Sequence, residues 1–525
     1  MLLPRSARSW HRRQPSAVLR LLALFLCLLF LQTRVAHSPL EDEPEPEPEP
    51  VPGAARVKTP LLNEQAAFWR DLYLIIQNND PQCEHPPEAV VPHKMDIGFD
   101  PSHNHPRPDV LWVEAADIKR MREAHSNFVN DLRRSPPQIV YGPGSRGIVM
   151  TAGYDQLPVL VTSIRMLRRT SSHLPVEVFL ADVSDYDDEI CDSVLPPLNA
   201  KCLLLSDVFH TARSGVSINH FQYKIMAVLF SSFEEVLLLD SDAFPLHDPS
   251  PLFDQDPFNS TGMVMWPDFW YASESPYYFE IAKIDAIPSL QTRASMESGE
   301  ILYSKSKHSL SIMLATYYNF WGPVYYYPLL SQGAPGQGDK ETFAWAATAL
   351  NEPFYAVNKP VMAAGRLDSN GKWLGSAMIQ HDPTTDAEVC KPGLTDSGHE
   401  VVLGPADPSS GNIAASVKPF FIHANFPKFD PSSIFTQSDD IAGHGGPTRD
   451  SNGTSVRCWM DQDRAIEVFG FDVEYRFWEE IKSTACEHEQ QFGCWRGKQG
   501  ICKRVTKYWY DVFEPRAQKK QETSL

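Results

Sequence analysis

Between residues 147 and 239 the apolar positions follow two alternating patterns. Short continuous apolar runs predict buried β-strands, and apolar residues that recur every three or four positions predict amphipathic helices. The strand-like runs lie at 147–151, 176–180 and 236–239, and the helix-like segments at 157–167 and 221–229. The order strand, helix, strand, helix, strand is typical of a mostly parallel sheet covered by helices, so the sequence predicts an α/β fold.

A basic segment followed by an apolar run stands at the N-terminus. Arginines at positions 5, 8, 12, 13 and 20 precede an unbroken apolar run from Leu21 to Leu31. This pattern predicts an uncleaved signal anchor within residues 1–37, with the basic flank in the cytoplasm and the body in the lumen. The run is shorter than the roughly 20 apolar residues of an ordinary membrane span, so a cleaved signal peptide stays the alternative.

Proline and glutamate alternate after this run. Residues 38–60 contain Glu-Asp-Glu-Pro-Glu-Pro-Glu-Pro-Glu-Pro, which predicts an extended stalk because proline blocks helix and sheet and like charges repel. We divide the rest into a helical and loop extension (61–137), a central domain (138–435) and a cysteine-containing C-terminal region (436–525). Two helices are expected in the extension, at 64–77 and 115–132.

Composition narrows the function class. The chain has 525 residues, and its 66 acidic and 47 basic residues give a formal net charge of −19. A general nucleic-acid binder needs a basic face, so this balance argues against that class. An acidic chain that binds an anionic ligand needs a local cation, either a metal ion or a few placed lysines and arginines.

Cysteine usage points to an oxidising compartment. Eight of the nine cysteines lie outside the apolar N-terminal run, at positions 83, 191, 202, 390, 458, 486, 494 and 502. An even number beyond a signal segment is typical of a protein that forms disulfides in the secretory lumen. The last four are expected to staple the C-terminal region, and the pairing stays open. Glycosylation sequons at Asn259 and Asn452 agree with this location.

The third predicted strand ends in two carboxylates, Asp240 and Asp242. Active sites of such sheets lie at the carboxyl ends of the strands. Two oxygen ligands there suit Mg²⁺ or Mn²⁺, which gathers a diphosphate and neutralises charge that develops on a phosphate leaving group. Alone, the Asp-x-Asp pattern is weak, because a solvated strand-to-loop turn gives the same residues.

A phosphatase of the haloacid dehalogenase type also begins with an apolar strand and Asp-x-Asp. That class places Thr or Val directly after the second aspartate, where this chain has Ala243. It also needs a later apolar strand that ends in Asp-Asp, and the candidate Asp439-Asp440 follows polar residues. We therefore do not favour a phosphatase.

Further blocks accompany the aspartate pair, in order, between residues 147 and 430. They are Phe221-Gln222-Tyr223-Lys224, Pro245 with Asp248-Pro249, Glu297-Ser298-Gly299, Tyr317-Tyr318-Asn319-Phe320, the stretch from Leu329 to Phe343, and His423-Ala424-Asn425 with Pro427-Lys428. Together they resemble the fungal Golgi α-mannosyltransferases of glycosyltransferase family 71. The likeness is greater to members that begin α-1,2 side branches on an α-1,6 mannose backbone. The stretch from Cys458 onward shows no such match.

The resemblance implies a GT-A type nucleotide-sugar-binding fold in a single-pass type II Golgi membrane protein with a lumenal catalytic domain. It implies transfer of mannose from GDP-mannose to a mannan or glycoprotein glycan, with retention of the α configuration and with Mn²⁺ or Mg²⁺ as cofactor. A complex with other Golgi transferases is a further expected partner. An α-1,3 linkage or another nucleotide sugar stays open, because no residue reads the linkage or the base.

Within this resemblance we expect Asp242 to bind the metal directly and Asp240 to touch the metal or the ribose. His423 follows an apolar run and is expected to complete the metal site, as a late histidine does in related transferases. His381 is the alternative ligand. The competing interpretation of His423 is a histidine with a purely structural role.

Other residues are expected to contact the donor. Lys224, on the helix before the third strand, and Lys428 are candidates for the diphosphate, with solvated surface lysines as the alternative. Thr151, Ala152 and Gly153 end the first strand, where a nucleotide would meet backbone groups. An ordinary strand exit is the alternative there.

Asp339 and Glu341 stand just before a predicted helix at 342–350. Carboxylates at a helix N-terminus favour the macrodipole and cap free N–H groups, which is a structural explanation. The functional one is that either residue binds acceptor hydroxyls or stabilises an oxocarbenium-like sugar. Retention by double displacement or by front-face attack stays open. Glu297 is a further candidate for the acceptor site.

Aromatic residues are dense at 266–278 and 317–327, where they form either an acceptor groove or core. The competing function class is a catalytically silent glycan-binding relative. The intact Asp-x-Asp and Gly-Asp-Lys-Glu blocks argue against it, because silent relatives tend to lose such groups.

Overall fold

The structure is a computed structural model that describes residues 59–86, 97–389, 417–436, 438–439, 443–444 and 446–522. The predicted signal anchor, nearly all of the predicted stalk and Cys390 lie outside these residues. Within the described part, the structure contains no helix with the length and apolar character of a membrane span.

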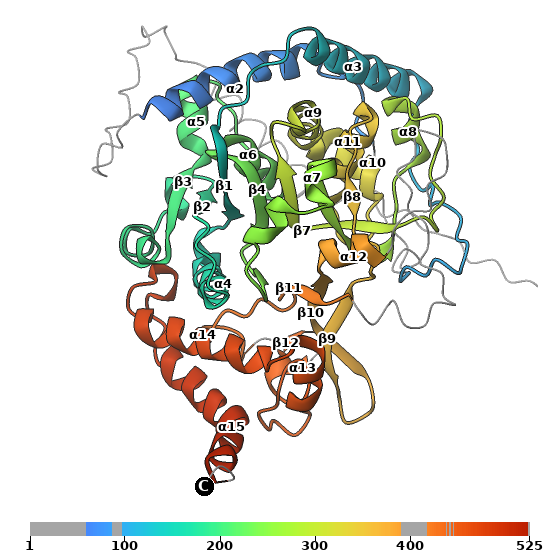
Figure 1. The fold of residues 1–525 in the computed structure, drawn as a ribbon. Coiled ribbons are helices and arrows are strands. Elements are labelled where there is room, and N and C mark those ends of the chain that lie inside the picture. The colour runs from blue at the N-terminus through green and yellow to red at the C-terminus, as the bar shows by residue number, and fades with distance from the viewer. Residues whose placement is uncertain are drawn as a thin grey trace, which may run out of the picture. The chain divides into compact units, whose positions relative to one another are not determined.

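A seven-stranded sheet forms the centre of this part of the chain (Figure 1). Its strands are, in spatial order, β3 (Ala200–Leu204), β2 (Val176–Leu180), β1 (Gly142–Thr151), β4 (Phe233–Asp240), β7 (Ala294–Ser304), β6 (Met263–Tyr271) and β8 (Tyr355–Ala356). The first four are parallel, β7 runs antiparallel to both β4 and β6, and β8 is parallel to β6. The α/β prediction is confirmed, with a mixed sheet.

Both faces of the sheet are buried. Along β4, Val236 and Leu238 pack into one hydrophobic core, while Leu237 and Leu239 pack into another. Successive residues of a strand point to opposite faces, so a continuous apolar run is what a sheet covered on both sides requires. The covering helices α4 (Leu157–Arg169) and α6 (Tyr223–Phe230) match the helices predicted between the strands.

The remaining helices before the C-terminal region are α2 (Pro60–Asn78), α3 (Ala115–Arg134), α5 (Leu205–Ala212), α7 (Phe258–Thr261), α8 (Pro276–Ala282), α9 (Ser309–Phe320), α10 (Tyr327–Ser331), α11 (Lys340–Leu350) and α12 (Pro383–Val389). The helices α2, α3 and α11 confirm three sequence predictions. Strand β3 and helix α5 were not predicted. The middle residues of β3 are exposed or only partly buried, so the strand lacks a continuous apolar run.

A second, four-stranded antiparallel sheet begins directly after the aspartate pair. Its strands are β5 (Ala243–Pro245), β11 (Pro419–His423), β10 (Trp373–His381) and β9 (Met362–Leu367). A two-stranded ribbon pairs β12 (Ser438–Asp439) with β13 (Gly443–His444). The pairing of β5 with β11 brings a late segment of the chain to the end of β4.

The C-terminal helices are α13 (Gln462–Phe469), α14 (Val473–His488) and α15 (Ile501–Glu522). Helix α14 lies beside α4 in Figure 1, and Arg165 on α4 donates to Glu480 on α14 at 2.8 Å. The side chains of Trp478 and Phe477 belong to the same core as Leu237 and Leu239. The C-terminal helices therefore share a core with the main sheet.

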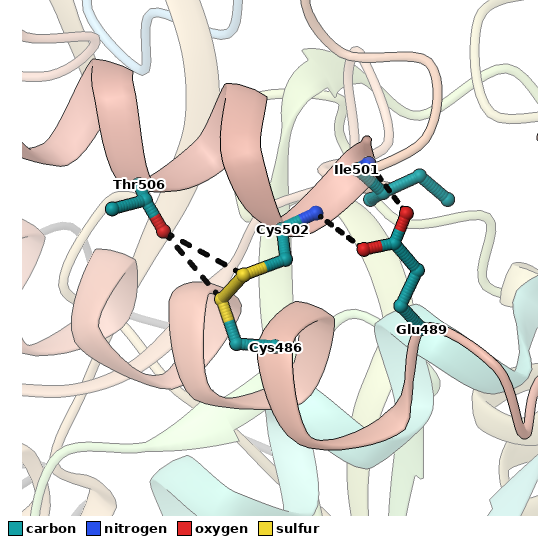
Figure 2. The surroundings of a disulfide bond; sticks show 5 residues. All are labelled: Cys486, Glu489, Ile501, Cys502 and Thr506. Atoms are coloured by element: carbon teal, nitrogen blue, oxygen red, sulfur yellow. Dashed lines mark hydrogen bonds between the residues drawn. A yellow bond between two sulfur atoms is a disulfide. The ribbon is translucent and has the colours of Figure 1, made fainter. Parts of the chain in front are cut away.

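A disulfide between Cys486 and Cys502 joins α14 to α15 (Figure 2). Beside it, the carboxylate of Glu489 accepts hydrogen bonds from the backbone N–H groups of Ile501 at 2.8 Å and Cys502 at 3.1 Å. These N–H groups belong to the first turn of α15, where no intrahelical acceptor exists. The segment between the two helices is thus fixed at both ends.

The predicted C-terminal staple is confirmed for one pair only. Cys458 and Cys494 carry free thiols, as does Cys83. The other disulfide of the described residues joins Cys191 to Cys202, outside the C-terminal region.

Candidate active site

Strand β4 carries Asp240 to the carboxyl edge of the main sheet, and the chain then turns through Asp242 into β5. Thr151 lies opposite Asp240 in the parallel register of β1 and β4. Ala152 and Gly153 follow it, so the three residues predicted to meet a nucleotide lie beside the aspartate pair. The backbone amide of Ala152 donates to the carbonyl of Phe179 on β2 at 3.2 Å.

His423 is brought to the aspartates by sheet pairing. In the β5–β11 register it lies opposite Ala243, and the amide of Ala424 donates to the carbonyl of Asp242 at 2.9 Å. Its Nε2 atom lies 3.3 Å from Oδ1 of Asp242 and 3.6 Å from Oδ2 of Asp240. The three residues predicted as metal ligands therefore converge.

His381, the alternative ligand, does not join this cluster. It ends β10, where its carbonyl accepts a hydrogen bond from the indole of Trp266 at 2.7 Å. Burial, together with the ammonium of Lys359, lowers the pKa of the His381 imidazole to about 3.

Glu297, on β7, fixes the orientation of His423. Its Oε1 atom accepts from Nδ1 of His423 at 2.9 Å and from the amide of Gly299 at 3.0 Å. A Cβ atom at Gly299 would lie 2.5 Å from Nδ1 of His423, so only glycine allows this approach. A carboxylate that holds one imidazole nitrogen leaves the other directed at a metal. The sequence pointed to Glu297 only as a candidate for the acceptor site.

Two lysines balance the aspartates. Lys224, on α6, contacts Asp240 at 2.9 Å and donates to the carbonyl and hydroxyl of Ser298, each at 3.0 Å. Lys428 forms an ion pair with Oδ2 of Asp242. Burial disfavours the ammonium of Lys224, yet the carboxylates of Asp240, Asp339 and Glu297 raise its pKa above the usual value. Both lysines thus lie where a diphosphate beside the aspartates would need cations.

The cluster also shifts the titration of its members. Burial disfavours the charged form of His423, but the carboxylates of Glu297 and Asp242 raise its pKa well above the usual value. Burial likewise opposes the ionised form of Asp242, and His423 and Lys428 hold its pKa well below the usual range. The site is therefore an ion-paired network in which the surrounding carboxylates favour the charged imidazole.

Glu300 is a second carboxyl group that the sequence did not single out. It lies two strand positions beyond Ser298 on β7, is fully buried, and neither of its oxygens has a hydrogen-bond partner among the described residues. Burial, with the charge of Glu297 added, raises the pKa of Glu300 well above its usual value. Burial therefore disfavours the charged form of Glu300, which lies close to Glu297 and His423.

A cleft of about 420 Å³ adjoins the cluster. Lys224, Glu297 and Ser298 form part of its wall, and so does Asp339. Asp339 is 2% exposed, and its Oδ2 atom accepts no hydrogen bond within the described part of the chain. Burial raises its pKa to about 6. The ammonium of Lys224 lowers this pKa, but the charges of Asp240 and Glu297 counteract that effect. Asp339 occupies the N-cap position of α11 without capping it through its side chain, so helix capping does not explain the residue.

Glu341 lies elsewhere. Its carboxylate accepts from the amide of Met296 at 2.7 Å and pairs with Arg293 at 3.1 Å. Glu341 does not line the cleft, whereas its neighbour Lys340 does. The ammonium of Lys340 donates to the carboxylate of Asp268, the hydroxyl of Ser295 and the carbonyl of Pro335, at 2.9 Å each. The structure thus joins Asp339, but not Glu341, to the cluster.

The dense aromatic segments are mostly core. Trp266, Tyr317 and Tyr318 are fully buried, whereas Phe269 and Trp270 reach the cleft. The other aromatic residues of the cleft are Phe221 and Phe426, which are half-exposed and lie in other segments.

The donor set fits a divalent cation. Oδ1 of Asp242 and Nε2 of His423 are both buried, and neither has a hydrogen-bond partner among the described residues. One oxygen of each aspartate and a nitrogen of His423 lie within 4.8 Å of one another. Adjacent ligands of an octahedral ion with metal–ligand distances of about 2.1 Å are separated by about 3.0 Å. The observed 3.3 and 3.6 Å need only a small adjustment.

Fold and site together define an α/β protein with a candidate cation-binding edge beside a cleft. A family model described as "Mannosyltransferase putative" matches residues 145–294 and 288–390. An α-1,2-mannosyltransferase of Candida albicans (MNN21) is 32% identical over 72% of this chain and 63% of its own length. An α-1,2-mannosyltransferase of Saccharomyces cerevisiae (MNN2) is 30% identical over 73% of this chain and 74% of its own.

The chain belongs to this mannosyltransferase family. It spans 63% of the length of the Candida albicans relative. Among solved structures, the glycosyltransferase GlyE of Streptococcus pneumoniae TIGR4 aligns with a TM-score of 0.28 and 14% identity, over 41% of this chain and 45% of its own. That likeness is too distant to carry an argument.

Proposed function

We propose that the protein is a metal-dependent, retaining glycosyltransferase of the GT-A type. It transfers mannose from GDP-mannose to a mannose-containing glycan, and it forms an α-1,2 linkage. The observation that carries the proposal is the convergence of two buried ligand atoms, Oδ1 of Asp242 and Nε2 of His423, beside Asp240 and next to the cleft. Both relatives are named as α-1,2-mannosyltransferases, which supports the transferred sugar and the linkage.

Asp240, Asp242 and His423 would hold Mn²⁺ or Mg²⁺. Such an ion, when bound, supplies charge that stabilises the departing diphosphate. Because the carboxylates of Glu297 and Asp242 raise the pKa of His423, a cation would compete with a proton for Nε2, and metal affinity should rise with pH. Glu297 keeps Nδ1 of His423 engaged, which directs Nε2 at the aspartates.

The lysines serve the diphosphate. Lys224 is anchored by Ser298 and keeps its ammonium at the edge of the cleft. Lys428 is half-exposed and contacts Asp242 in the absence of a ligand. With Asp242 engaged on a cation, the ammonium of Lys428 would be free to contact a donor phosphate. Both lysines supply the local positive charge that a chain of net charge −19 otherwise lacks.

Asp339 serves the sugars. Its buried Oδ2 has no acceptor role inside the described protein, so it is poised to accept a hydrogen bond from a hydroxyl in the cleft. A carboxylate there also stabilises positive charge on an oxocarbenium-like sugar. Front-face attack requires no covalent intermediate, and this arrangement serves it as well as a double displacement.

The direct test is the release of GDP from GDP-mannose by the full-length protein with Mn²⁺ and a mannoside acceptor. We expect release that EDTA stops, and no comparable release from UDP-galactose or UDP-xylose. The Asp242→Ala variant should lose at least about a hundredfold of this activity while it stays folded, as a cooperative thermal transition would show. Asp463→Asn, an exposed position on α13, is the control. Full activity of Asp242→Ala, or turnover in EDTA, would remove the metal from the proposal.

We further propose that the protein is a single-pass type II membrane protein of the Golgi with this site in the lumen. The two disulfides support an oxidising compartment. Protease protection of the C-terminal half in intact Golgi vesicles, lost on adding detergent, is the expected result. Digestion without detergent would contradict it.

A further inference from the structure

The carboxyl edge of the main sheet can be followed strand by strand away from the aspartates. Asp240 ends β4, Glu297 and Ser298 lie on the neighbouring β7, and Asp268 lies on β6, the strand after that. Asn358 follows β8, the last strand. Adjacent strands are about 4.8 Å apart, so the β8 end lies about 14 Å from the aspartates. A hexose unit is about as long as one strand spacing, so this edge has room for sugar rings in sequence.

A bulge in β6 divides this edge into two cavities. Pro267 pairs with Met296, and Tyr271 pairs with Ala294, so β6 uses four steps where β7 uses two. The residues between them are displaced from the ladder. Residues 97–99 provide hydrogen-bond partners for the backbone of this displaced segment. The amide of Phe99 donates to the carbonyl of Phe269 at 2.7 Å. Bulges next to active sites redirect side chains in this way.

The second cavity has a volume of about 290 Å³ and lies beyond this bulge. It shares Asp268 and Phe269 with the cleft, so the two spaces meet at a common wall. Its other lining residues include Phe99, Thr292, Arg293, Asn358 and Val361. The volume is at the lower end of the range for small-molecule sites, which suits one sugar ring.

The charges around this cavity favour a neutral ligand. Asp268 is paired with Lys340 at 2.9 Å. Arg293 is paired with Glu341 at 3.1 Å and its guanidinium lies 5.1 Å from the ring centroid of Trp345. Both charged groups are therefore already balanced, and a phosphate would find no open cation there. The rings of Phe99 and Phe269 offer apolar faces of the kind on which sugars stack.

We propose that this cavity is a second acceptor subsite, which binds the mannose residue adjacent to the one that receives the new sugar. The inference rests on the proposed function and adds the preferred acceptor, a chain of at least two mannose residues. In this arrangement the cleft beside Asp339 holds the donor sugar and the accepting residue. The adjacent mannose residue of the acceptor passes Asp268 and Phe269, which line both spaces, and occupies the second cavity.

The test compares kcat/KM for an α-mannose monosaccharide, disaccharide and trisaccharide with full-length protein, GDP-mannose and Mn²⁺. We expect the disaccharide to exceed the monosaccharide by about tenfold, with little further gain from the trisaccharide, since remote binding raises kcat/KM. Val361→Phe, which fills the cavity, and Phe99→Ala, which removes a ring, should bring this ratio close to one. Val110→Phe is the matched control, because Val110 is an exposed valine that lines neither cavity.

A ratio is used because a general loss of folded protein lowers both values equally. The proposal is overturned if the wild-type ratio is near one, or if it stays near ten in both Val361→Phe and Phe99→Ala. A protein that transfers mannose to none of these acceptors, and releases no GDP, would instead contradict the proposed function itself. Turnover of the monosaccharide with an unchanged ratio in the variants rejects only the second subsite.

Discussion

Asp339 is a buried carboxyl group whose ionisation matters for both function and stability. Burial raises its pKa to about 6, with Asp240 and Glu297 opposing Lys224. If its carboxylate accepts from a substrate hydroxyl, transfer should decrease as the pH falls through about 6. Asp339→Asn should be at least about tenfold less active at pH 7.5 and should lack this decrease. Initial rates from pH 5 to 8 measure it, and an unchanged profile in Asp339→Asn would assign the decrease to another group.

The same shift has a consequence for stability. The folded-state pKa of Asp339 lies above the usual 3.8, so the folded state holds the proton more tightly than the unfolded chain. The contribution of this raised pKa to the free energy of unfolding is complete below about pH 3.8, and it is lost as the pH rises through about 6. At pH 8 the loss amounts to roughly 3 kcal/mol at about 1.4 kcal/mol per pKa unit.

Asp339→Asn should therefore unfold at a higher urea concentration than the wild type at pH 8 in EDTA. The difference should shrink toward pH 4.5, where the wild-type carboxyl group is protonated in the folded state. A variant that is equally destabilised at both pH values would show that the carboxylate is not strained by burial.

Gly299 tests the position of His423 without touching a ligand atom. Its missing side chain leaves the space in which Nδ1 of His423 and Oε1 of Glu297 meet. Gly299→Ala should displace the imidazole and raise the Mn²⁺ concentration for half-maximal activity by about tenfold or more. Gly142→Ala, on β1, is the control, because its Cβ would meet neighbours only at ordinary contact distance. Equal Mn²⁺ dependence in both variants would argue against His423 as a ligand.

At the scale of elements, the link between α14 and α15 depends on one disulfide. Cys486 and Cys502 are 16 residues apart, and a loop of that size contributes about 3 kcal/mol when it is closed. The double variant Cys486→Ser, Cys502→Ser should lose about this much in urea denaturation. Cys494→Ser, in the same segment but without a disulfide, should change little. A loss in the Cys494 variant as large as in the double variant would assign the effect to packing.

The elements differ in how much the sequence reveals of them. β1, β2 and β4 are buried on both faces, so their apolar runs are continuous and lead directly to Asp240 and Asp242. Strand β7 is also entirely buried, yet it carries Glu297, Ser298 and Glu300, because one end of it faces the site. A strand whose buried residues are polar for functional reasons has no hydrophobic signature. The contact between Glu297 on this strand and His423 could not be predicted from sequence spacing.

At the scale of the whole molecule, the C-terminal region is part of the common core. Trp459 and Trp478 are fully buried in the same cluster as residues of β1, β4 and α4. A chain that ends at Thr454 should therefore lack a cooperative thermal transition, because it would expose the face of α4 that α14 covers. A chain that ends at Glu514 keeps Phe513 and should melt like the full-length protein. A normal transition in the shorter chain would show that these helices fold independently.

The sequence predicted the elements of this molecule better than their long-range contacts. The sequence blocks named His423 and Lys428 as site residues, but only the pairing of β11 with β5 brings them to Asp242. Glu341 was grouped with Asp339 by proximity in sequence. A step of two residues at the start of α11 nevertheless separates Asp339, which lines the cleft, from Glu341, which pairs with Arg293. Tertiary pairing, which leaves no local pattern, decides such cases.

The β5–β11 pairing also sets when the proposed cation site can first exist. Asp240 and Asp242 leave the ribosome long before His423, and the strand that carries His423 closes the second sheet against β5. A nascent chain halted before that strand would possess both carboxylates of the proposed cation site but not its imidazole. Premature termination anywhere upstream of β11 therefore yields a product that lacks the complete proposed cation site, however well its first sheet has formed.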